Sequence, residues 1–177
     1  VARSPAPRGE AGRLGLTGSI DGDEETHDAV RGVKGSWRRA VKGVQAVREA
    51  AARSSRGPEI RINSTLTGQN HARLLDTWRS LKHLRPDSFV FVQLGYLTPE
   101  MAAEHNRMHP QFPMKESCDS QSGRLEVDVS RLAEQMALVR AEASGQTRLS
   151  FFPEMRADQL EDYYRRPEVF IEGRRCH

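Results

Sequence analysis

The feature that most constrains this sequence is the run Ser88–Leu94 (SFVFVQL), which is almost entirely apolar. It contains two phenylalanines and two β-branched valines, and Gly95 follows it directly. Strands of parallel sheets have this composition because they are covered on both faces, whereas half-exposed strands alternate apolar and polar residues. The run therefore predicts a strand of a parallel sheet, and parallel strands need long connections, usually helices, between them.

Three other segments are predicted to be strands of the same sheet. Leu14–Ile20 is a weak candidate, Glu59–Leu66 alternates apolar and polar residues, and Thr147–Phe152 is short. Helical periodicity or a helix-start signal is found between and after them, with expected helix starts at Ser36, Asn70, Thr98, Val129 and Ala157. Strands that alternate with helices indicate βαβ units, so the expected fold class is α/β with a parallel sheet.

Local residues also predict where some helices begin and where the chain forms a loop. Ser36 and Asn70 are expected to cap helices, because their side chains can accept hydrogen bonds from N–H groups of the first turn. The polar segment 21–35 contains three glycines and is expected to be a loop.

The composition restricts the classes of protein to which the chain can belong. Its 177 residues carry 27 basic and 24 acidic side chains, a net charge of +3, and only four of the basic residues are lysine. No window approaches eighteen consecutive apolar residues, and no long apolar stretch follows the early arginines, so neither a membrane span nor a signal peptide is expected. We therefore expect a cytoplasmic protein with a modest apolar core.

The strongest local signal follows the first strand candidate, in the segment Ser19–Gly32 (SIDGDEETHDAVRG). The carboxyl ends of parallel strands form the ligand-binding edge of α/β proteins. Ser19 and Asp21 therefore lie where side-chain oxygens can bond the hydroxyl or amino groups of a ligand. The alternative is that Asp21 and Gly22 form a turn and that the following acidic residues are solvated.

The motif resembles the radical S-adenosylmethionine (radical SAM) superfamily, in particular members with a SPASM-type carboxyl-terminal cluster domain. The order of the following segments is similar as well: a Gly-Ser-aromatic helix start at 35–37, a fifth strand at 59–67 and a sixth strand at 88–95. The resemblance implies a partial parallel (β/α) barrel of about three to four strands with flanking helices.

The resemblance also implies a division of the chain. Residues 1–18 are expected to form a loose tail with a weak strand, and 19–170 the carboxyl-terminal half of the barrel. Residues 171–177 are expected to be a stub that leads to an auxiliary cluster region. The amino-terminal half of the barrel, which holds the catalytic cluster in this family, is expected to be the missing partner of this chain.

Radical SAM enzymes cleave S-adenosylmethionine reductively with a [4Fe–4S] cluster, and the resulting radical abstracts a hydrogen atom from the substrate. By resemblance, Ser19 and Asp21 lie near the ribose or the amino-acid end of S-adenosylmethionine, Asn63 is a further candidate contact, and Arg31 reaches a carboxylate. The residues themselves leave alternatives open. Asn63 can make a hydrogen bond at the end of the sheet, and Arg31 can form a salt bridge within its loop.

The sequence also departs from the family's pattern. Neither the C-x3-C-x2-C motif that holds the cluster nor a Gly-Gly-Glu type motif occurs. Cys176 falls where the accessory-cluster region usually opens with its first metal-binding cysteine, but one thiolate cannot hold a cluster. We therefore expect a fragment of a radical SAM enzyme that binds no cofactor by itself and is inactive alone.

Three weaker candidates remain. His105 and His109 stand one helical turn apart beside Glu104, but they lack a third ligand for zinc. Cys118 lies in a polar segment and is not expected to be catalytic. The segment 163–166 (YYRR) can stack on bases or form a basic patch, and the alternative is that it packs at a helix end.

The alternative function is a non-catalytic α/β binding module that presents an arginine-rich surface to nucleic acid or to an acidic partner. Arginines gathered on one face would favour it. They are instead spread over nearly every segment of the sequence, so nucleic-acid binding is not expected. No motif in the sequence indicates the substrate.

Overall fold

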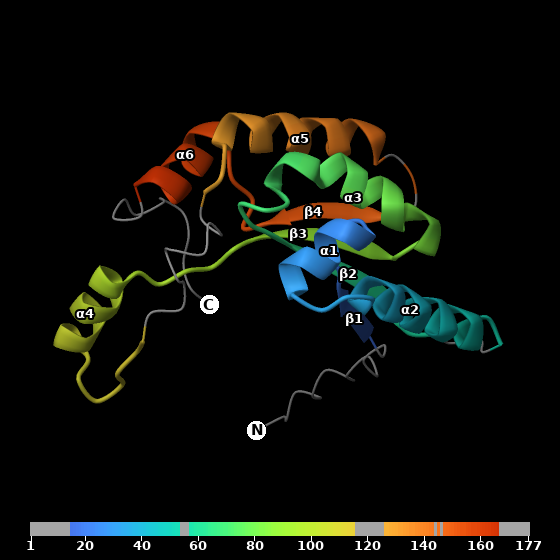
Figure 1. Ribbon diagram of the computed structural model, residues 1–177, viewed down its shortest axis with the longest axis horizontal. Helices are drawn as coiled ribbons and strands as arrows, with labels where there is room; N and C mark the ends of the chain where they lie inside the picture. The colour runs from blue at the N-terminus through green and yellow to red at the C-terminus, as the bar shows by residue number, and fades with distance from the viewer. Residues whose placement is uncertain (1–14, 54–56, 116–125, 144, 146, 167–177) are drawn as a thin grey trace, which may run out of the picture.

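The computed structural model describes residues 15–53, 57–115, 126–143, 145 and 147–166. One parallel sheet has its four strands in chain order: β1 (Gly15–Ser19), β2 (Glu59–Leu66), β3 (Ser88–Gln93) and β4 (Arg148–Phe152). Within the described residues the sheet is not closed into a barrel, because β1 and β4 each pair with one strand only (Figure 1). The expected α/β class with three to four parallel strands is confirmed.

Helices connect the strands and follow the last one. They are α1 (Glu24–Arg31), α2 (Ser36–Ala52), α3 (Leu74–Leu81), α4 (Pro99–Met108), α5 (Val129–Glu142) and α6 (Ala157–Arg165), with short 3-10 turns η1 (His71–Arg73) and η2 (Lys82–Leu84). Each connection leads to the next strand in the same direction, as in a (β/α) barrel, whereas the strand order of a doubly wound sheet reverses. In the part of the chain that the structure describes, no helix is long and apolar enough to cross a membrane.

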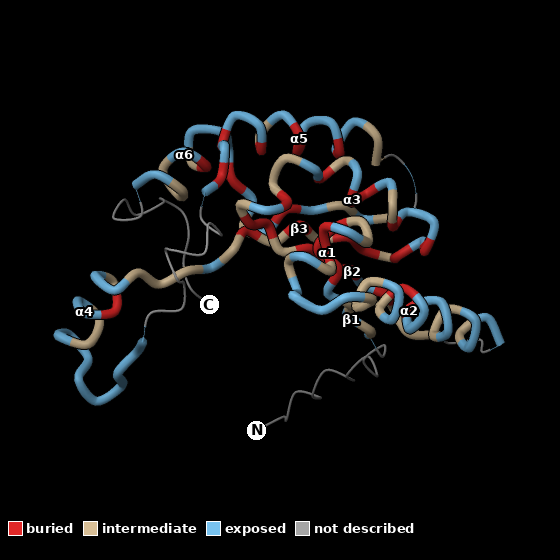
Figure 2. The backbone as a smooth tube through the Cα atoms, in the orientation of Figure 1, coloured by how far each residue is buried: buried red, intermediate tan, exposed pale blue. Residues whose placement is uncertain are grey.

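The apolar core lies between the helices and one face of the sheet. Trp78 of α3 packs edge-on against Phe89 of β3, with ring centroids 5.6 Å apart. The Arg140 guanidinium of α5 lies 4.5 Å from the centre of the Phe151 ring of β4. Figure 2 shows buried residues along the strands and on the sides of α3 and α5 that face the sheet. The fully buried large apolar side chains are Ile20, Ile60, Ile62, Leu66, Leu74, Leu81, Phe89, Phe91, Leu132, Val139 and Leu160.

Side chains on the opposite face of the sheet are much more exposed. The register aligns one residue of each strand in a single row: Ser19, Asn63, Val90 and Ser150. The two serines are exposed, the middle two residues are half-buried, and Phe152, farther along β4, is 65% exposed. None of the described helices covers this face. The run Ser88–Leu94 is therefore packed against helices on one side, and not on both sides as its composition predicts.

The segment 21–35 contains a helix, which corrects the prediction of a loop. Asp23 caps α1 by accepting a hydrogen bond from Thr26 N at 3.0 Å. Gly32 ends the helix with a φ of 65°, in the left-handed region that favours glycine. Two acidic residues in its first turn and one arginine in its last match the helix dipole. Apolar periodicity does not reveal such a helix, because it is short and mostly polar.

Two of the expected helix caps are also corrected. Ser36 is the first residue of α2, the capping position is Gly35 with a φ of 77°, and the capping carboxylate comes from Asp28 of α1. Asn70 precedes η1 without capping it by a side-chain hydrogen bond. Its carboxamide bonds to other parts of the chain, as described below for the candidate site.

Helix α4 projects away from the sheet (Figure 1). As predicted, it begins at Thr98 and Pro99: the Thr98 hydroxyl accepts a hydrogen bond from Met101 N at 3.2 Å, and proline occupies the first helical position. The chain beyond the helix is held by Asn106, whose carboxamide donates to Met114 O and accepts from Met114 N. The arm formed by residues 98–115 is thus ordered by its own hydrogen bonds.

We predict that two neighbouring phenylalanines of β4 contribute very differently to stability. Phe151 is 3% exposed and stacks on Phe91, with ring centroids 5.3 Å apart, whereas Phe152 points to the uncovered face. Phe151→Ala should lower the free energy of unfolding by about 3–5 kcal/mol, because it removes packing and leaves a cavity. Phe152→Ala should change it by less than about 0.5 kcal/mol. Urea unfolding followed by circular dichroism measures both, and equal losses would contradict the one-sided packing of the sheet.

Candidate functional site

The sequence motif and the second strand meet at the carboxyl ends of β1 and β2. Ser19 and Asn63 are register partners on these two strands, and Ile20 N donates to Asn63 O at 2.9 Å directly after β1. The structure thus brings Ser19 and Asn63 together on the uncovered face of the sheet. Asp21 follows two residues later and enters the interior, where it is 1% exposed.

The Asp21 carboxylate is fully engaged within the protein. Its Oδ1 accepts a hydrogen bond from Thr65 N of β2 at 2.9 Å, and its Oδ2 lies 2.7 Å from Arg31 Nε of α1. A buried carboxylate is stable only when it is paired in this way. Asp21 therefore positions neighbouring groups and does not present a free carboxylate to a ligand.

Arg31 is held by this ion pair at the last turn of α1. The pair uses Nε, so the two terminal nitrogens of the guanidinium extend beyond it, and the side chain is 41% exposed. The alternative that Arg31 forms a local salt bridge is thus correct, and the bridge uses Nε. It is compatible with a second role, because a guanidinium has five N–H donors and a fixed geometry that matches a carboxylate.

Asn70 ties the ends of β1 and β2 together, a role that its position before a helical segment does not predict. Its Nδ2 donates to Asp21 O and to Thr65 O, both at 2.8 Å, and its Oδ1 accepts from Thr67 N at 2.8 Å. The side chain is 2% exposed, and its carboxamide has partners on both sides. This hydrogen bonding fixes the backbone on which Asp21 is placed.

His27 of α1 completes the network as a neutral imidazole. Its Nδ1 accepts a hydrogen bond from Asp21 N at 3.0 Å, so this nitrogen carries no proton. The 3.7 Å between Nδ1 and Asp21 Oδ2 therefore separates two acceptors and is no ion pair. Burial lowers the pKa of His27, and the charge of Arg31 lowers it further, against the opposing effect of Asp21.

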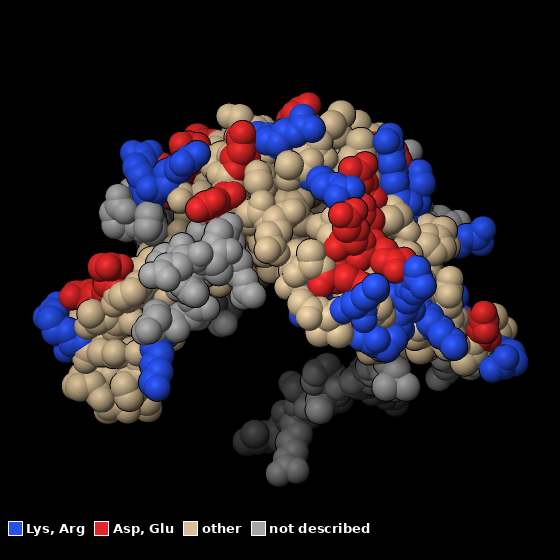
Figure 3. All heavy atoms as spheres, in the orientation of Figure 1, with Lys and Arg blue, Asp and Glu red and all other residues tan. Residues whose placement is uncertain are grey.

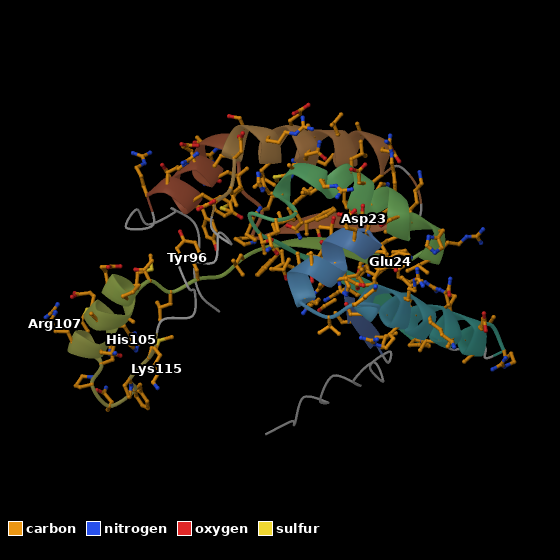
Figure 4. The ribbon with its side chains drawn as sticks, viewed as in Figure 1. Asp23, Glu24, Tyr96, His105, Arg107 and Lys115 are labelled. Carbon is orange, nitrogen blue, oxygen red and sulfur yellow. The ribbon has the colours of Figure 1, made fainter. Side chains whose placement is uncertain are left out.

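Two further contacts fix the start of the motif. At Gly22, a Cβ would lie 2.6 Å from Thr26 Cβ, so only glycine fits here without a shift. Gly22 O accepts a hydrogen bond from Trp37 Nε1 at 3.1 Å. Asp23 is held by Arg73 of η1, whose Nη2 lies 2.7 Å from Asp23 Oδ2. Figure 4 labels Asp23 at the beginning of α1.

Asp28 on α1 caps the next helix and so fixes α1 against α2. It accepts hydrogen bonds from Trp37 N at 2.9 Å, from Gly35 N and from the Ser36 hydroxyl at 2.8 Å. The bond from Trp37 N is the largest cause that lowers the pKa of Asp28 to about 2. The contribution of this group to stability is therefore present above its ordinary pKa of 3.8 and is lost as the pH falls toward 2.

The groups that remain available for a ligand are those on the uncovered face and at its edge. Among the described residues, the exposed Ser19 hydroxyl makes no hydrogen bond to a side chain or the backbone, and Asn63 Oδ1 is covered and unpartnered. A buried acceptor without a donor is unfavourable. These two groups and the exposed part of Arg31 are the candidates for contact with a ligand.

The other candidates from the sequence give no second site. Cys118 and the predicted metal ligand Cys176 lie outside the described residues. The rings of His105 and His109 lie 5.1 Å apart on the α4 arm (Figure 4 labels His105), and His105 Nε2 lies 3.0 Å from Phe112 O. Within the described residues, no group of three or more His, Cys, Asp or Glu side chains could hold a metal ion.

The tyrosine pair of α6 packs against the sheet. Tyr163 donates its hydroxyl to Leu94 O at 2.8 Å, and Tyr164 donates to Gln93 Oε1 at 2.7 Å. Burial raises the pKa of Tyr163 to about 12 and raises that of Tyr164 further still. The sequence left open whether this segment stacks on bases or packs at a helix end. The two tyrosines pack at the helix end, because both hydroxyls bond to groups at the end of β3.

The arginines form ion pairs across the surface. Figure 3 shows basic and acidic side chains next to one another on the face in view. The described arginines that pair with a carboxylate are Arg31, Arg38, Arg48, Arg73, Arg79, Arg107, Arg131, Arg140, Arg148, Arg156, Arg165 and Arg166. A guanidinium that is already paired attracts a phosphate backbone less, so this surface does not favour the alternative of an arginine-rich binding module.

Comparison with known proteins gives no assignment. No protein-family model matches this sequence, and no curated protein matches it.

We predict that His27 makes the stability of the protein depend on pH between about 7 and 5. Its pKa is lowered in the folded state, so its contribution is fully present above the ordinary value of 6.5 and is lost as the pH falls below it. The slope from one such group is at most about 1.4 kcal/mol per pH unit. His27→Asn keeps an acceptor for Asp21 N but does not titrate, and should flatten this dependence.

Urea unfolding of both proteins at several pH values measures the difference. His83→Asn is a suitable control, because His83 lies in η2, away from the network, and is exposed. Parallel curves for the wild type and His27→Asn would contradict the assignment of a neutral, buried imidazole.

Proposed function

We propose that this chain is part of a radical SAM enzyme and contributes the S-adenosylmethionine side of an incomplete (β/α) barrel. The observation that carries the proposal is that Ser19 and Asn63 are register partners at the carboxyl ends of β1 and β2, and that Asp21, two residues after Ser19, holds Arg31. Ser19, Asn63 and Arg31 are three of the four residues that the resemblance implies as cofactor contacts. The fourth, Asp21, acts as the positioning residue for Arg31.

The strand order supports a barrel rather than an open doubly wound sheet. Four parallel strands follow one another in chain order, and the described helices pack on one face. The other face carries the row that contains Ser19 and Asn63, as the inner face of a (β/α) barrel carries residues that line its interior. We propose that the remaining strands come from a segment beyond these residues or from a second chain.

The available groups match the polar parts of S-adenosylmethionine. The terminal nitrogens of Arg31 suit its carboxylate, because guanidinium and carboxylate pair through two parallel hydrogen bonds. Asn63 Oδ1 is covered and unpartnered, and would accept from an amino or hydroxyl group once its half-buried side chain turns toward the ligand. The Ser19 hydroxyl can donate or accept. When bound, S-adenosylmethionine supplies the group that a reduced cluster cleaves. This chain would bind and orient it.

The residues present do not fit the [4Fe–4S] cluster of the family. Such clusters are held by cysteine thiolates, and the sequence has two cysteines, without a C-x3-C-x2-C motif. No step of the radical reaction can therefore be assigned to residues of this chain. We propose that catalysis requires a cluster-binding part from elsewhere, and that the chain alone is inactive.

The sequence leads to the expectation that the chain alone binds no cofactor, and a binding measurement tests it. Because Asp21 already holds Arg31 in place, we predict weak binding of S-adenosylmethionine, in the millimolar range, by the chain alone. In a titration followed by ¹H–¹⁵N NMR, signals of Ser19, Arg31 and Asn63 should shift saturably. Asn63→Ala and Arg31→Gln should each weaken binding about tenfold, since each loses a hydrogen bond to the ligand.

Matched controls separate binding from folding. Ser150→Ala changes the same row at its far end, and Arg38→Gln removes an exposed arginine that pairs with Glu24 near the same helix. Both should bind as the wild type does. Because Arg31→Gln leaves Asp21 without its cation, circular dichroism must first establish that this variant is folded. The absence of any shift with the wild type, or equal shifts in Asn63→Ala, would refute the proposed site.

We also predict that anaerobic reconstitution with iron and sulfide gives no stoichiometric [4Fe–4S] absorption band with this chain alone. The physical reason is the lack of three suitably spaced thiolates. A ferredoxin apoprotein treated in parallel serves as the positive control. A stoichiometric band from this chain would contradict the view that its cluster-binding part lies elsewhere.

A further inference from the structure

A hollow of about 590 Å³ lies at the amino ends of β3 and β4, at the opposite edge of the sheet from the candidate site. Trp78 of α3 and Arg48 of α2 form part of its wall. Asp87 and Thr147, which directly precede β3 and β4, form another part. The volume lies within the range of small-molecule sites in proteins.

Two N–H donors of this wall have no acceptor. Trp78 is 5% exposed, and its indole Nε1 is buried without a hydrogen-bond partner. Nε of Arg48 is likewise buried and unpartnered. Tryptophan N–H groups usually find an acceptor when they are buried, as Trp37 does with Gly22 O at 3.1 Å. Two N–H groups of wall residues, Trp78 Nε1 and Arg48 Nε, therefore lack a hydrogen-bond acceptor.

The carboxylates of the wall are already engaged. Asp87 Oδ2 accepts from Ile60 N at 2.7 Å and lies 3.4 Å from Arg48 Nη2. Glu142 accepts from Arg79 Nε at 2.8 Å and from Lys82 Nζ at 2.9 Å. Among the residues that the structure describes, neither carboxylate is bonded to the two orphan donors, and an acceptor from a ligand would satisfy them.

The charge of the wall indicates what kind of acceptor fits. The ionised side chains that line the hollow are three cations and two carboxylates: Arg48, Lys82, Arg85, Asp87 and Glu142. Arg79, which bonds Glu142 from outside this lining, adds a further positive charge. The wall is therefore electropositive and favours an anion, and a carboxylate has two oxygens that can accept from two N–H donors.

We propose that this hollow binds the carboxylate group of a small organic acid, whose oxygens accept from Trp78 Nε1 and Arg48 Nε. The two nitrogens are covered in this structure, so the ligand reaches them when a side chain of the wall moves. Lys82 is 51% exposed and has the long, flexible side chain that such a movement needs. The site is independent of S-adenosylmethionine binding, because it lies at the other edge of the sheet.

The two tryptophans provide a direct test. The chain has two of them, and therefore two indole N–H signals in a ¹H–¹⁵N NMR spectrum, which Trp37→Phe assigns. Acetate is added as the probe at constant ionic strength, with sodium chloride as the balancing salt. The signal of Trp78 should move downfield and saturate, because a free N–H gains an acceptor. The signal of Trp37 should stay in place.

Variants locate the binding. Arg48→Gln should weaken acetate binding about tenfold, since a charged donor is lost. Arg53→Gln, at the end of the same helix and outside the wall of the hollow, should leave it unchanged. Because Arg48 also bonds Arg85 O and Asp87, Lys82→Gln is a second variant that removes positive charge without this anchor, and it should weaken binding as well.

Several outcomes would overturn the proposal. One is a Trp78 signal that does not shift, or that shifts linearly and together with that of Trp37. Another is equal affinity in wild type, Arg48→Gln and Lys82→Gln. A third is saturable binding of inorganic phosphate at concentrations where acetate has no effect, which would exclude the assignment to a carboxylate.

Discussion

The buried carboxylate of Asp21 is the constraint on which the candidate site depends. It joins β2, through Thr65 N, to α1, through Arg31, and its own backbone is held by His27 and Asn70. Removing one partner of such a buried pair is strongly destabilising, because the remaining charge is left without compensation. The same contact uses only Nε of Arg31, so its terminal nitrogens extend beyond Asp21 at the edge where we propose that a ligand binds. The stability of the fold and the proposed binding of a ligand therefore both depend on the Asp21 side chain.

The one-sided packing of the sheet determines where the two proposed sites lie. Helices bury one face of the four strands, and the other face presents the row of Ser19 and Asn63 at the carboxyl ends. At the amino ends, Trp78 and Arg48 from two different helices line part of the hollow. The first site is built on strand ends and a tight turn, whereas the second is lined by residues of α2, α3 and η2 and of the segments that precede β3 and β4.

Much of the fold was predictable, and the failures have identifiable causes. Composition located the strands, because burial in a parallel sheet favours apolar, β-branched residues. Periodicity located most helices, because one face of a helix repeats every three to four residues. Helix α1 was missed because its hydrogen bonds and charges, rather than an apolar stripe, define it. The position of Asn70 before a helical segment predicts a cap. Its side chain instead links two strand ends, because it donates to the carbonyl oxygens of Asp21 and Thr65. Local sequence patterns do not show which carbonyl group such a side chain reaches.

The sequence by itself determined the α/β class, the parallel sheet and the segment in which Ser19, Asp21 and Arg31 lie, because these follow from local composition and spacing. Tertiary structure decided how these residues are used. Packing buried Asp21 and turned it into the partner of Arg31, left Asn63 Oδ1 without a donor and brought Arg48 and Trp78 to one hollow. Burial and hydrogen-bond partners depend on residues far apart in the chain, and local patterns carry no information about which distant groups meet.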